Sequence, residues 1–309
     1  MSPTELVKEE LLEDGTIIQT YKSGDFVVCN LSSIHLGRAI PANVLERLIK
    51  IQVRMLDNVI DVNDLPVKAS QHTNKRYRNV GLGTFSLHHI MALNGIRWGS
   101  EEGIKFNDVE YERIAYLAIK ASMELAEEKG AYPLFKGSDW DNGDFFVKRD
   151  YGTEKYSDEG RYITNEQWRE LASLVHENGI RNGQLLAVAP NGSTSILANG
   201  TASIDPVFNQ FYYEEKKDYK IPVVVPDLSP RTAFFYENAY TVDQHSSIKQ
   251  NAARQRHIDQ SQSFNLYVDN KIKASELLSL VMEAWEQGMK TIYYTRSTSI
   301  NVLECESCT

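Results

Sequence analysis

The stretch QLLAVAPNGSTSILANG, residues 184–200, combines three elements in the order typical of an α/β fold. Its first part, Gln184 to Ala189, is almost entirely apolar, as expected of a strand that is buried on both faces. A turn containing Gly192 follows, and hydroxyl side chains then open a segment of helical character. Backbone N–H groups at a helix start suit phosphate oxygens. The chain has no Walker lysine here, and Asn-Gly is also a common hairpin signal, so in isolation the stretch favours a hairpin.

Strands and helices are expected to alternate on both sides of this stretch. Helices are expected over residues 42–60, 107–129, 165–177, 243–256 and 275–287. Further strands are expected over residues 16–21, 26–31 and 291–294. This alternation predicts the α/β class, with buried and largely parallel strands. No linker divides the chain, so we expect one domain over residues 1–295 and a flexible tail over residues 296–309.

Local patterns add detail to this outline. The residues SPTE at positions 2–5 match a capping box with proline in the first turn, which predicts a short helix ending near Gly15. The segment 22–25 has the composition of a hairpin turn. A Gly-Leu-Gly sequence at 81–83 precedes an expected helix from about Phe85. Residues 131–164 are rich in Gly, Asp, Tyr and Trp, which predicts irregular surface structure.

Composition excludes several classes of function. The chain of 309 residues has 33 Lys and Arg against 42 Asp and Glu, a net charge of −9. This balance argues against a nucleic-acid-binding surface, although a pocket for a single nucleotide stays possible. No apolar run is long enough to cross a membrane, and the acidic N-terminus lacks a secretory signal. The expected location is therefore the cytoplasm, where three cysteines do not make a disulfide framework.

Two of the three cysteines, Cys305 and Cys308, lie in the last five residues. This spacing occurs in half-sites for zinc and in redox pairs, but it also occurs without function in tails. Zinc needs about four ligands, and no second pair completes the set, so no metal is expected. An exposed dithiol on a mobile segment can exchange with a disulfide elsewhere, so the residues leave a redox pair and an inert tail open.

Two other candidates have common structural explanations. Cys29, in the strand-like FVVCNLSS, has the pattern of a small buried hydrophobic residue, the usual environment of a free cysteine. Tyr293 and Tyr294 are ordinary strand formers, one for each face. The functional alternative for this pair is two stacked phenols that pass an electron and a proton.

Taken together and in this order, several segments resemble the C-terminal part of the large, catalytic subunit of class I ribonucleotide reductase. They are VCNLSSIHLGRAI, RNVGLGTFSLHHIMALNG, KASMELAEEKGAYPLF, HENGIRNGQLLAVAPNGSTSILANGTASIDP, RHIDQSQSFNLYV, GMKTIYYTR and CESC. The PNGSTS and tail spacings resemble the class Ib branch most. The resemblance implies a ten-stranded α/β barrel made of two five-stranded halves, of which residues 1–295 supply the second half.

The resemblance also implies a substrate pocket. Cys29 matches one member of the cysteine pair that supplies two reducing equivalents and becomes a disulfide at each turnover. Leu31 and Ser32 follow it along the same pocket strand. The loop that holds the diphosphate of a ribonucleoside diphosphate matches Pro190, Asn191, Gly192, Ser193 and Thr194.

Radical transfer and re-reduction are implied at the C-terminal end. Tyr293 and Tyr294 match the pair that relays a radical from a small, metal-containing subunit. Cys305 and Cys308 match the tail dithiol that re-reduces the pocket and is itself reduced by a thioredoxin- or glutaredoxin-like protein. No cofactor is expected to bind this chain itself.

One family element is missing from the sequence. The family pattern Asn-x-Cys-x-Glu, which provides the thiyl-radical cysteine and a general base, does not occur, and Leu31 stands where a glutamate would follow Cys29. We therefore expect the C-terminal half of a split catalytic subunit, inactive alone and paired with an N-terminal chain, in a bacterium or in the host cytoplasm if phage-encoded. The alternative is a non-catalytic module that binds the small subunit or a reductase. A glycyl-radical enzyme is not supported, because no suitable glycine loop lies near the C-terminus.

Overall fold

The computed structural model describes residues 2–215 and 220–298. In chain order the strands are β1 Glu5–Leu11, β2 Ile17–Lys22, β3 Asn30–His35, β4 Val80–Phe85, β5 Phe211–Glu215, β6 Lys220–Val224, β7 Leu266–Val268 and β8 Thr295–Ser297. The helices are α1 Leu36–Ala39, α2 Leu45–Val62, α3 Lys68–Tyr77, α4 Leu87–Leu93, α5 Glu101–Lys129, α6 Asp144–Val147, α7 Asn165–Asn178, α8 Gly192–Leu197, α9 Gln244–Gln255 and α10 Ala274–Glu286, with a short 3-10 helix, η1, at Ala233–Phe235.

Five extended segments run parallel and side by side. Strand β3 pairs with β4, and β7 pairs with β8, both in parallel. An extended segment, residues 184–188, lies between these two pairs. It joins β4 through the bridge Leu82–Leu186 and joins the segment that leads into β7 through the bridge Val188–Gln262. The order is therefore β3, β4, 184–188, 262–268, β8. Within the described residues these segments do not close into a barrel, so β3 and β8 are the edges of a partial, half-barrel arrangement of α/β class, as predicted.

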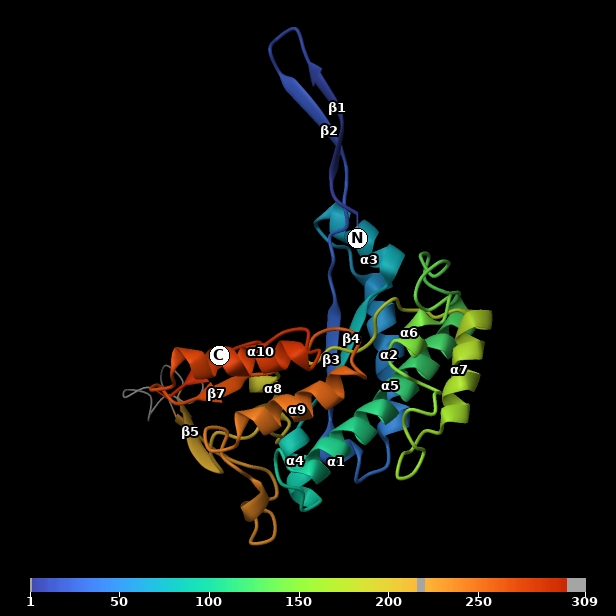
Figure 1. The fold of residues 1–309 in the computed structure, drawn as a ribbon. Coiled ribbons are helices and arrows are strands. Elements are labelled where there is room, and N and C mark those ends of the chain that lie inside the picture. Colours follow the sequence, from blue (N-terminus) through green and yellow to red (C-terminus); the bar gives the residue numbers. More distant parts are fainter. Residues whose placement is uncertain (1, 216–219, 299–309) are drawn as a thin grey trace.

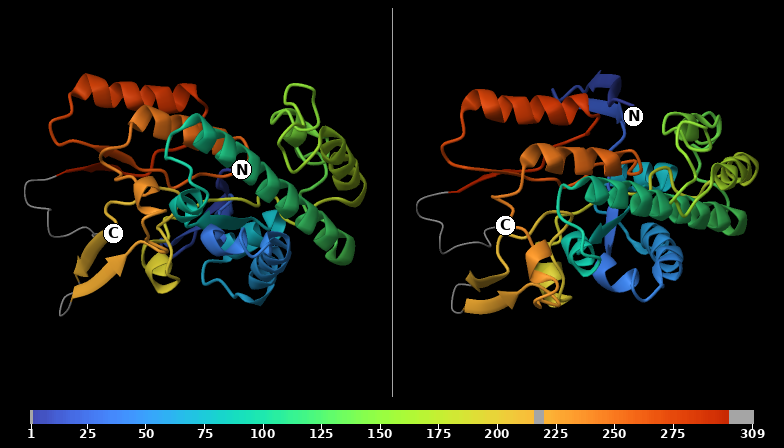
Figure 2. Two further views of the ribbon diagram at one scale, coloured as in Figure 1. Left: turned by 90° about the horizontal axis from the view of Figure 1, so that it is seen from below. Right: turned by 60° about the horizontal axis from the view of Figure 1, so that its bottom comes forward.

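Helices cover one face of these strands. Helices α2, α5, α9 and α10 contact one another in that order, and α2 also contacts β3 and β4. The apolar stripe of α2 packs into a core that includes Leu82, Leu186 and Val188 from the strands. A second core beneath α9 and α10 contains Phe264 and Leu266. Figure 2 shows α5 crossing between α2 and the α9–α10 pair. We call the opposite side of the strands the open face.

The N-terminal segment differs from the prediction. Instead of a short helix, residues 5–22 form the antiparallel hairpin β1–β2, which projects away from the body of the molecule (Figure 1). Its turn is closed by the bond from the Leu12 N–H to the Thr16 carbonyl, 2.8 Å. The predicted turn at 22–25 is also wrong. Asp25 forms hydrogen bonds with Ser2, so the chain at this point runs beside its own first residues. Pairing with 17–22 outweighs the local helical preference of 5–11.

The strands expected over 26–31 and 291–294 are displaced toward the C-terminus, because β3 is Asn30–His35 and β8 is Thr295–Ser297, but the expected helices are confirmed. Helices α2, α5, α7, α9 and α10 confirm the five expected helices, although α5 begins earlier, at Glu101. Residues 184–197 form an extended segment, a turn and a helix, so the isolated hairpin interpretation is wrong. Segment 131–164 is mostly irregular, as predicted, but it buries several aromatic rings: Tyr132, Phe135, Trp140, Phe145, Phe146 and Tyr151.

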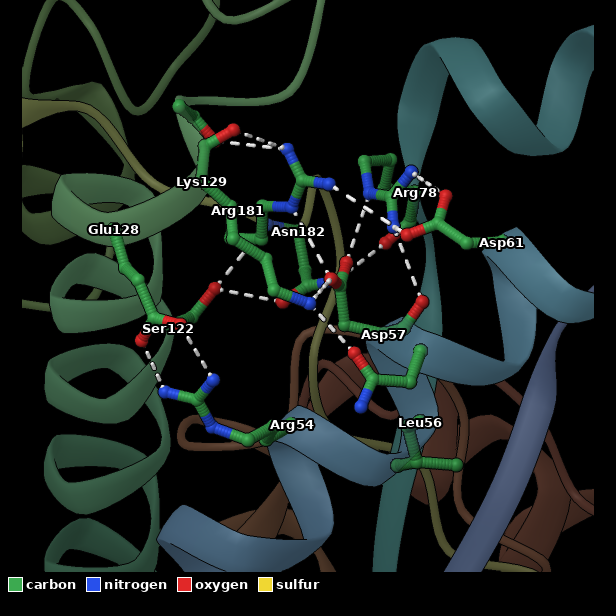
Figure 3. Close-up of polar contacts among 12 residues, drawn as sticks. Arg54, Leu56, Asp57, Asp61, Arg78, Ser122, Glu128, Lys129, Arg181 and Asn182 are labelled. Carbon is green, nitrogen blue, oxygen red and sulfur yellow. Dashed lines mark hydrogen bonds and ion pairs between the residues drawn. The ribbon is translucent and has the colours of Figure 1, made fainter.

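A buried polar network fixes the amino end of β4 (Figure 3). The carboxylate of Asp57 on α2 is fully buried and accepts from Arg78 Nε at 2.8 Å and from Arg181 Nε at 3.2 Å. Asn182 donates to the same carboxylate and to the Arg78 carbonyl. The Arg78 guanidinium also reaches Asp61 at 2.9 Å. These groups come from three chain segments, which are α2, the residues just before β4 and residues 181–182. The network therefore fixes the positions of these segments relative to one another.

Candidate active site

The edge strand β3 and the residue before it present two different faces. Asn30 Nδ2 donates to the Leu56 carbonyl of α2 at 3.1 Å, and Ser32 Oγ donates to Gln52 Oε1 of the same helix at 2.9 Å. Because side chains alternate along a strand, Cys29, Leu31 and Ser33 face the other way, onto the open face. The side chain of Ser32 is therefore not part of the pocket side, although the sequence placed it there.

Glycine in β4 makes room beneath these side chains. A Cβ built on Gly81 would lie 2.4 Å from Leu31 Cδ2 and 3.0 Å from Cys29 Sγ. A Cβ on Gly83 would lie 2.3 Å from the carbonyl oxygen of Ala187 in the neighbouring segment. Side chains larger than hydrogen would displace the cysteine or the backbone, so the open face has a floor of glycine and alanine.

The thiol of Cys29 contacts its own segment and a residue that precedes the fourth segment of the sheet. Its Sγ donates to the Asn30 carbonyl at 3.6 Å and to Gln260 Oε1 at 3.8 Å. The amide orientation of Gln260 is fixed, because its Nε2 donates to the Val80 carbonyl at 2.7 Å. Cys29 as a whole residue is exposed, but loss of hydration around its sulfur, with the nearby Asp259 as a smaller cause, raises the pKa of the thiol to about 11. The thiol is thus protonated at neutral pH.

Asp259 is a buried carboxyl group beside this thiol. Its two oxygens accept from the backbone N–H groups of Leu185, at 2.8 Å, and Leu186, at 2.6 Å. Burial raises the pKa of Asp259, and these two bonds oppose the rise. The carboxyl therefore holds residues 184–188 against the segment that begins at Gln260.

The Pro190–Thr194 turn meets the same strand. Asn191 has φ of 50°, the left-handed region that asparagine tolerates, and it precedes α8. Its Nδ2 donates to Ser33 Oγ at 3.0 Å and to the Ala189 carbonyl at 2.9 Å. Gly192 and Ser193 line a pocket next to the turn. The first N–H groups of a helix lack partners within the helix, so this turn can offer donors to an anion.

A model of the family described as "Ribonucleotide reductase, barrel domain" matches residues 15–295. The chain belongs to this family. It is 44% identical over its whole length to the ribonucleoside-diphosphate reductase subunit alpha of Treponema pallidum, covering 36% of that protein. The subunit alpha of Helicobacter pylori strain J99 is 36% identical, with 100% of this chain and 40% of the relative covered. The subunit alpha of Bacillus subtilis is 30% identical over 91% of this chain and 42% of the relative.

The chain thus spans less than half the length of these ribonucleotide reductase relatives. Among the described residues, no cluster of His, Cys, Asp and Glu could hold a metal ion. A search of the same residues also finds no helix long and apolar enough to cross a membrane.

The tyrosine pair lies on the opposite edge of the reductase half-barrel from Cys29. The backbone N–H of Tyr293 donates to the Phe264 carbonyl at 2.7 Å, and the Tyr294 carbonyl accepts from Leu266. The two rings lie 4.0 Å apart at 48°, and each residue is about half exposed. The hydrogen bond to Tyr294 raises the pKa of Tyr293. The rings therefore contact each other at a tilted angle rather than pointing to separate faces, and their role in radical transfer stays a prediction.

The structure brings some of the candidate residues together and separates others. Cys29, Leu31 and the Pro190–Thr194 turn share the open side of β3, whereas the Tyr pair is on β8's edge. Cys305 and Cys308 lie outside the described residues. Sequence reasoning missed Ser33, which strict alternation from Cys29 would have placed on the open face. It also assigned no role to Gly81.

Proposed function

We propose that the chain forms the C-terminal part of the catalytic site of a ribonucleoside-diphosphate reductase, which converts ribonucleoside diphosphates to deoxyribonucleoside diphosphates. The observation that carries the proposal is the hydrogen bond from Asn191 to Ser33. It joins the turn suited to phosphate oxygens to the strand that follows the Cys29 thiol. A diphosphate on the turn would therefore have its sugar over the glycine floor, within the neighbourhood of a reducing thiol.

Each group has a defined task in this proposal. The Pro190–Thr194 turn holds the diphosphate through its backbone N–H groups and hydroxyls. Cys29 gives up one proton and one electron, and a second cysteine outside this sequence gives up another proton and another electron. The two sulfurs form a disulfide while the ribose 2′-hydroxyl leaves as water. The protonated state of Cys29 suits this step, because the thiol must deliver a proton as well as an electron.

Three partners complete the reaction. An N-terminal part of the catalytic subunit, with Asn-x-Cys-x-Glu, supplies the thiyl-radical cysteine and the carboxylate base. A small, metal-containing subunit supplies the radical through Tyr293 and Tyr294, whose rings are in contact. A thioredoxin- or glutaredoxin-like protein reduces the Cys305–Cys308 pair. The reaction takes place in the cytoplasm, that of the host if the gene is phage-borne.

The test is reduction of cytidine diphosphate by this chain, first alone and then with the three partners. We expect activity only in the full mixture, with loss on Cys29→Ser and retention on Ser32→Ala, whose side chain faces α2. A stable complex without activity would instead indicate a module that binds the small subunit or a reductase. Activity of the chain with the small subunit alone would contradict the need for an N-terminal part.

A further inference from the structure

A second pocket lies under the amino ends of the five parallel segments. Each segment contributes at least one residue at or before its start, among them Val27, Asn79, Gln184, Asp259 and Lys290. The opposite wall comes from residues 138–149, which include α6, with Trp140, Phe145 and Arg149. The pocket thus lies at the opposite end of the strands from the Pro190–Thr194 turn. Its residue Val27 precedes Cys29 by two positions in the sequence.

Two polar groups of this pocket lack partners. Asn79 is 7% exposed, and its Oδ1 is buried without a hydrogen bond. The Nε of Arg149 is also buried without a partner. A buried acceptor and a buried donor without partners are both costly, so a ligand that supplies one of each would be favoured.

The charges of the pocket point to an anion. Within residues 2–215 and 220–298, Arg149 forms no ion pair. Its guanidinium stacks 3.7 Å from the Phe145 ring and donates to the Phe145 carbonyl at 3.1 Å. Lys290 Nζ contacts the backbone carbonyl of Asp259, while the Asp259 carboxyl is engaged by two backbone N–H groups. Lys148 is already paired with Asp139 at 2.6 Å. Arg149 is therefore the cation of this pocket that lacks an ion pair, although its charge also acts on the buried carboxyl of Asp259.

An acidic peptide carries both features that the pocket lacks. Its side-chain carboxylate can accept from Arg149, and its backbone N–H can donate to Asn79 Oδ1. The aromatic walls formed by Trp140 and Phe145 suit the apolar parts of such a peptide. The sequence of this chain contains a matching segment, Glu304-Cys305-Glu306-Ser307-Cys308.

We propose that this pocket docks the 304–308 segment of the same chain, with Glu306 on Arg149, and so delivers the tail thiols to Cys29. The inference deepens the proposed function and rests on it. From Thr298 to Cys308 the chain can span at most about 36 Å. The last strand rises about 26 Å between Lys290 and Thr298. The segment is therefore long enough to return to the pocket of its own chain.

The pocket is connected to the thiol through neighbouring residues. Asp259 lines the pocket, and the next residue, Gln260, accepts the hydrogen bond from Cys29. In this reaction one tail thiolate attacks the Cys29 sulfur of the pocket disulfide, forms a mixed disulfide with it and releases the other pocket cysteine as a thiolate. The second tail thiolate then attacks the tail sulfur of the mixed disulfide, which releases Cys29 as a thiolate and closes the Cys305–Cys308 disulfide. The two released thiolates take up the two protons that the tail thiols gave up. Two electrons pass from the tail to the pocket, and no other reactant is needed.

The test uses the full chain with Cys305→Ser and Cys308→Ser, in which Cys29 is the only cysteine. Cys29 is converted to its mixed disulfide with thionitrobenzoate, and a synthetic peptide of residues 301–309 is added. Release of coloured thionitrobenzoate is followed against peptide concentration. Dithiothreitol, an uncharged dithiol, serves as the reference reductant for access to the sulfur.

We expect release to saturate with peptide and to slow about tenfold at low peptide in Arg149→Glu, with the dithiothreitol rate unchanged. Arg149→Lys should keep most of the rate, and a peptide with lysine in place of Glu304 and Glu306 should restore it in Arg149→Glu. Arg47→Glu, an exposed cation outside the pocket, is the matched control.

Other outcomes separate the two proposals. Release that neither saturates nor depends on Arg149 would overturn the docking site while leaving the tail as reductant. Release by dithiothreitol but not by the peptide would overturn the docking site and also count against the tail's role in the proposed function. Inhibition by inorganic phosphate without saturation by peptide would assign the pocket to a free anion and overturn the inference.

Discussion

The side-chain amide of Asn191 donates to the hydroxyl of Ser33 across 3.0 Å, linking residues 158 apart in sequence. One belongs to the turn before α8 and the other to the edge strand β3. This contact fixes the turn relative to the open face, on which Cys29 also lies. Phosphate binding and reduction are therefore coupled in this proposal by a single side-chain contact between two short segments.

Removing that contact should weaken substrate binding more than folding. Asn191→Gly keeps a residue that tolerates φ of 50° but loses the bond to Ser33, a loss of about 1 kcal/mol. In the complete enzyme we expect the KM for cytidine diphosphate to rise about fivefold with a smaller change in kcat. Ser33→Ala should behave alike, and Ser32→Ala should leave the KM unchanged. Equal effects of both serine variants would contradict this account of the strand faces.

Gly81→Ala should disturb Cys29 specifically. The added Cβ would approach Leu31 Cδ2 to 2.4 Å and the Cys29 sulfur to 3.0 Å. We expect a loss of about 1–3 kcal/mol in the free energy of unfolding, measured in urea. Combining it with Leu31→Ala should recover part of the stability, because the closer of the two contacts is gone. If the double variant were as unstable as the sum of both singles, the clash would not be the cause.

The Cys29 thiol should titrate well above an ordinary cysteine. With Cys305 and Cys308 replaced by serine, the rate of alkylation by iodoacetamide should keep rising toward a pKa of about 11. Asp259→Asn should lower that pKa, because the carboxylate is a smaller cause of the shift. The thiol is favoured over the thiolate in the fold, so its contribution to stability is complete below about pH 9 and lost as the pH rises toward 11. A midpoint near 9 would contradict the environment described for Cys29.

Asp57→Ala should be strongly destabilising. It leaves the Arg78 and Arg181 guanidinium groups without their buried carboxylate, and removing one partner from such a network costs about 3–5 kcal/mol. Asp61 binds the same two arginines, but its side chain is 47% exposed. Asp61→Ala should therefore cost less than half as much in urea unfolding. Similar losses for both variants would mean that burial does not decide the energetics of this network.

The elements that sequence predicted well are those with local causes. Helix α7 begins at a capping box between Thr164 and Gln167, and both partners lie within four residues of each other. Helix α2 follows from an apolar stripe that includes Ile49, Val53 and Leu56. The alternation of such helices with apolar strands is enough to predict the α/β class, because each pattern can be read within a short window.

The features that sequence missed depend on distant partners. Residues 5–11 have a local preference for helix, yet their pairing with 17–22 makes them a strand. The contact of Cys29 with Gln260 joins residues 231 apart, and no local pattern indicates it. Ser33 could have been found from the sequence. Side chains alternate along a strand, so residues 29, 31 and 33 share one face and Ser32 lies on the other. The tail cysteines lie outside the described residues, so their role stays a prediction.

The last prediction concerns the ring contact on the other edge. Tyr293→Phe keeps the ring beside Tyr294, at 4.0 Å in the present structure, but removes the hydroxyl that would give up a proton with the electron. We expect cytidine diphosphate reduction by the complete enzyme to fall below detection, while urea unfolding changes by less than about 0.5 kcal/mol because the residue is 44% exposed. Tyr162→Phe, at an exposed tyrosine away from β8, should keep full activity and serves as the control. Retention of activity in Tyr293→Phe would exclude this phenol from radical transfer, and loss accompanied by unfolding would mean that the ring contact supports only the strand.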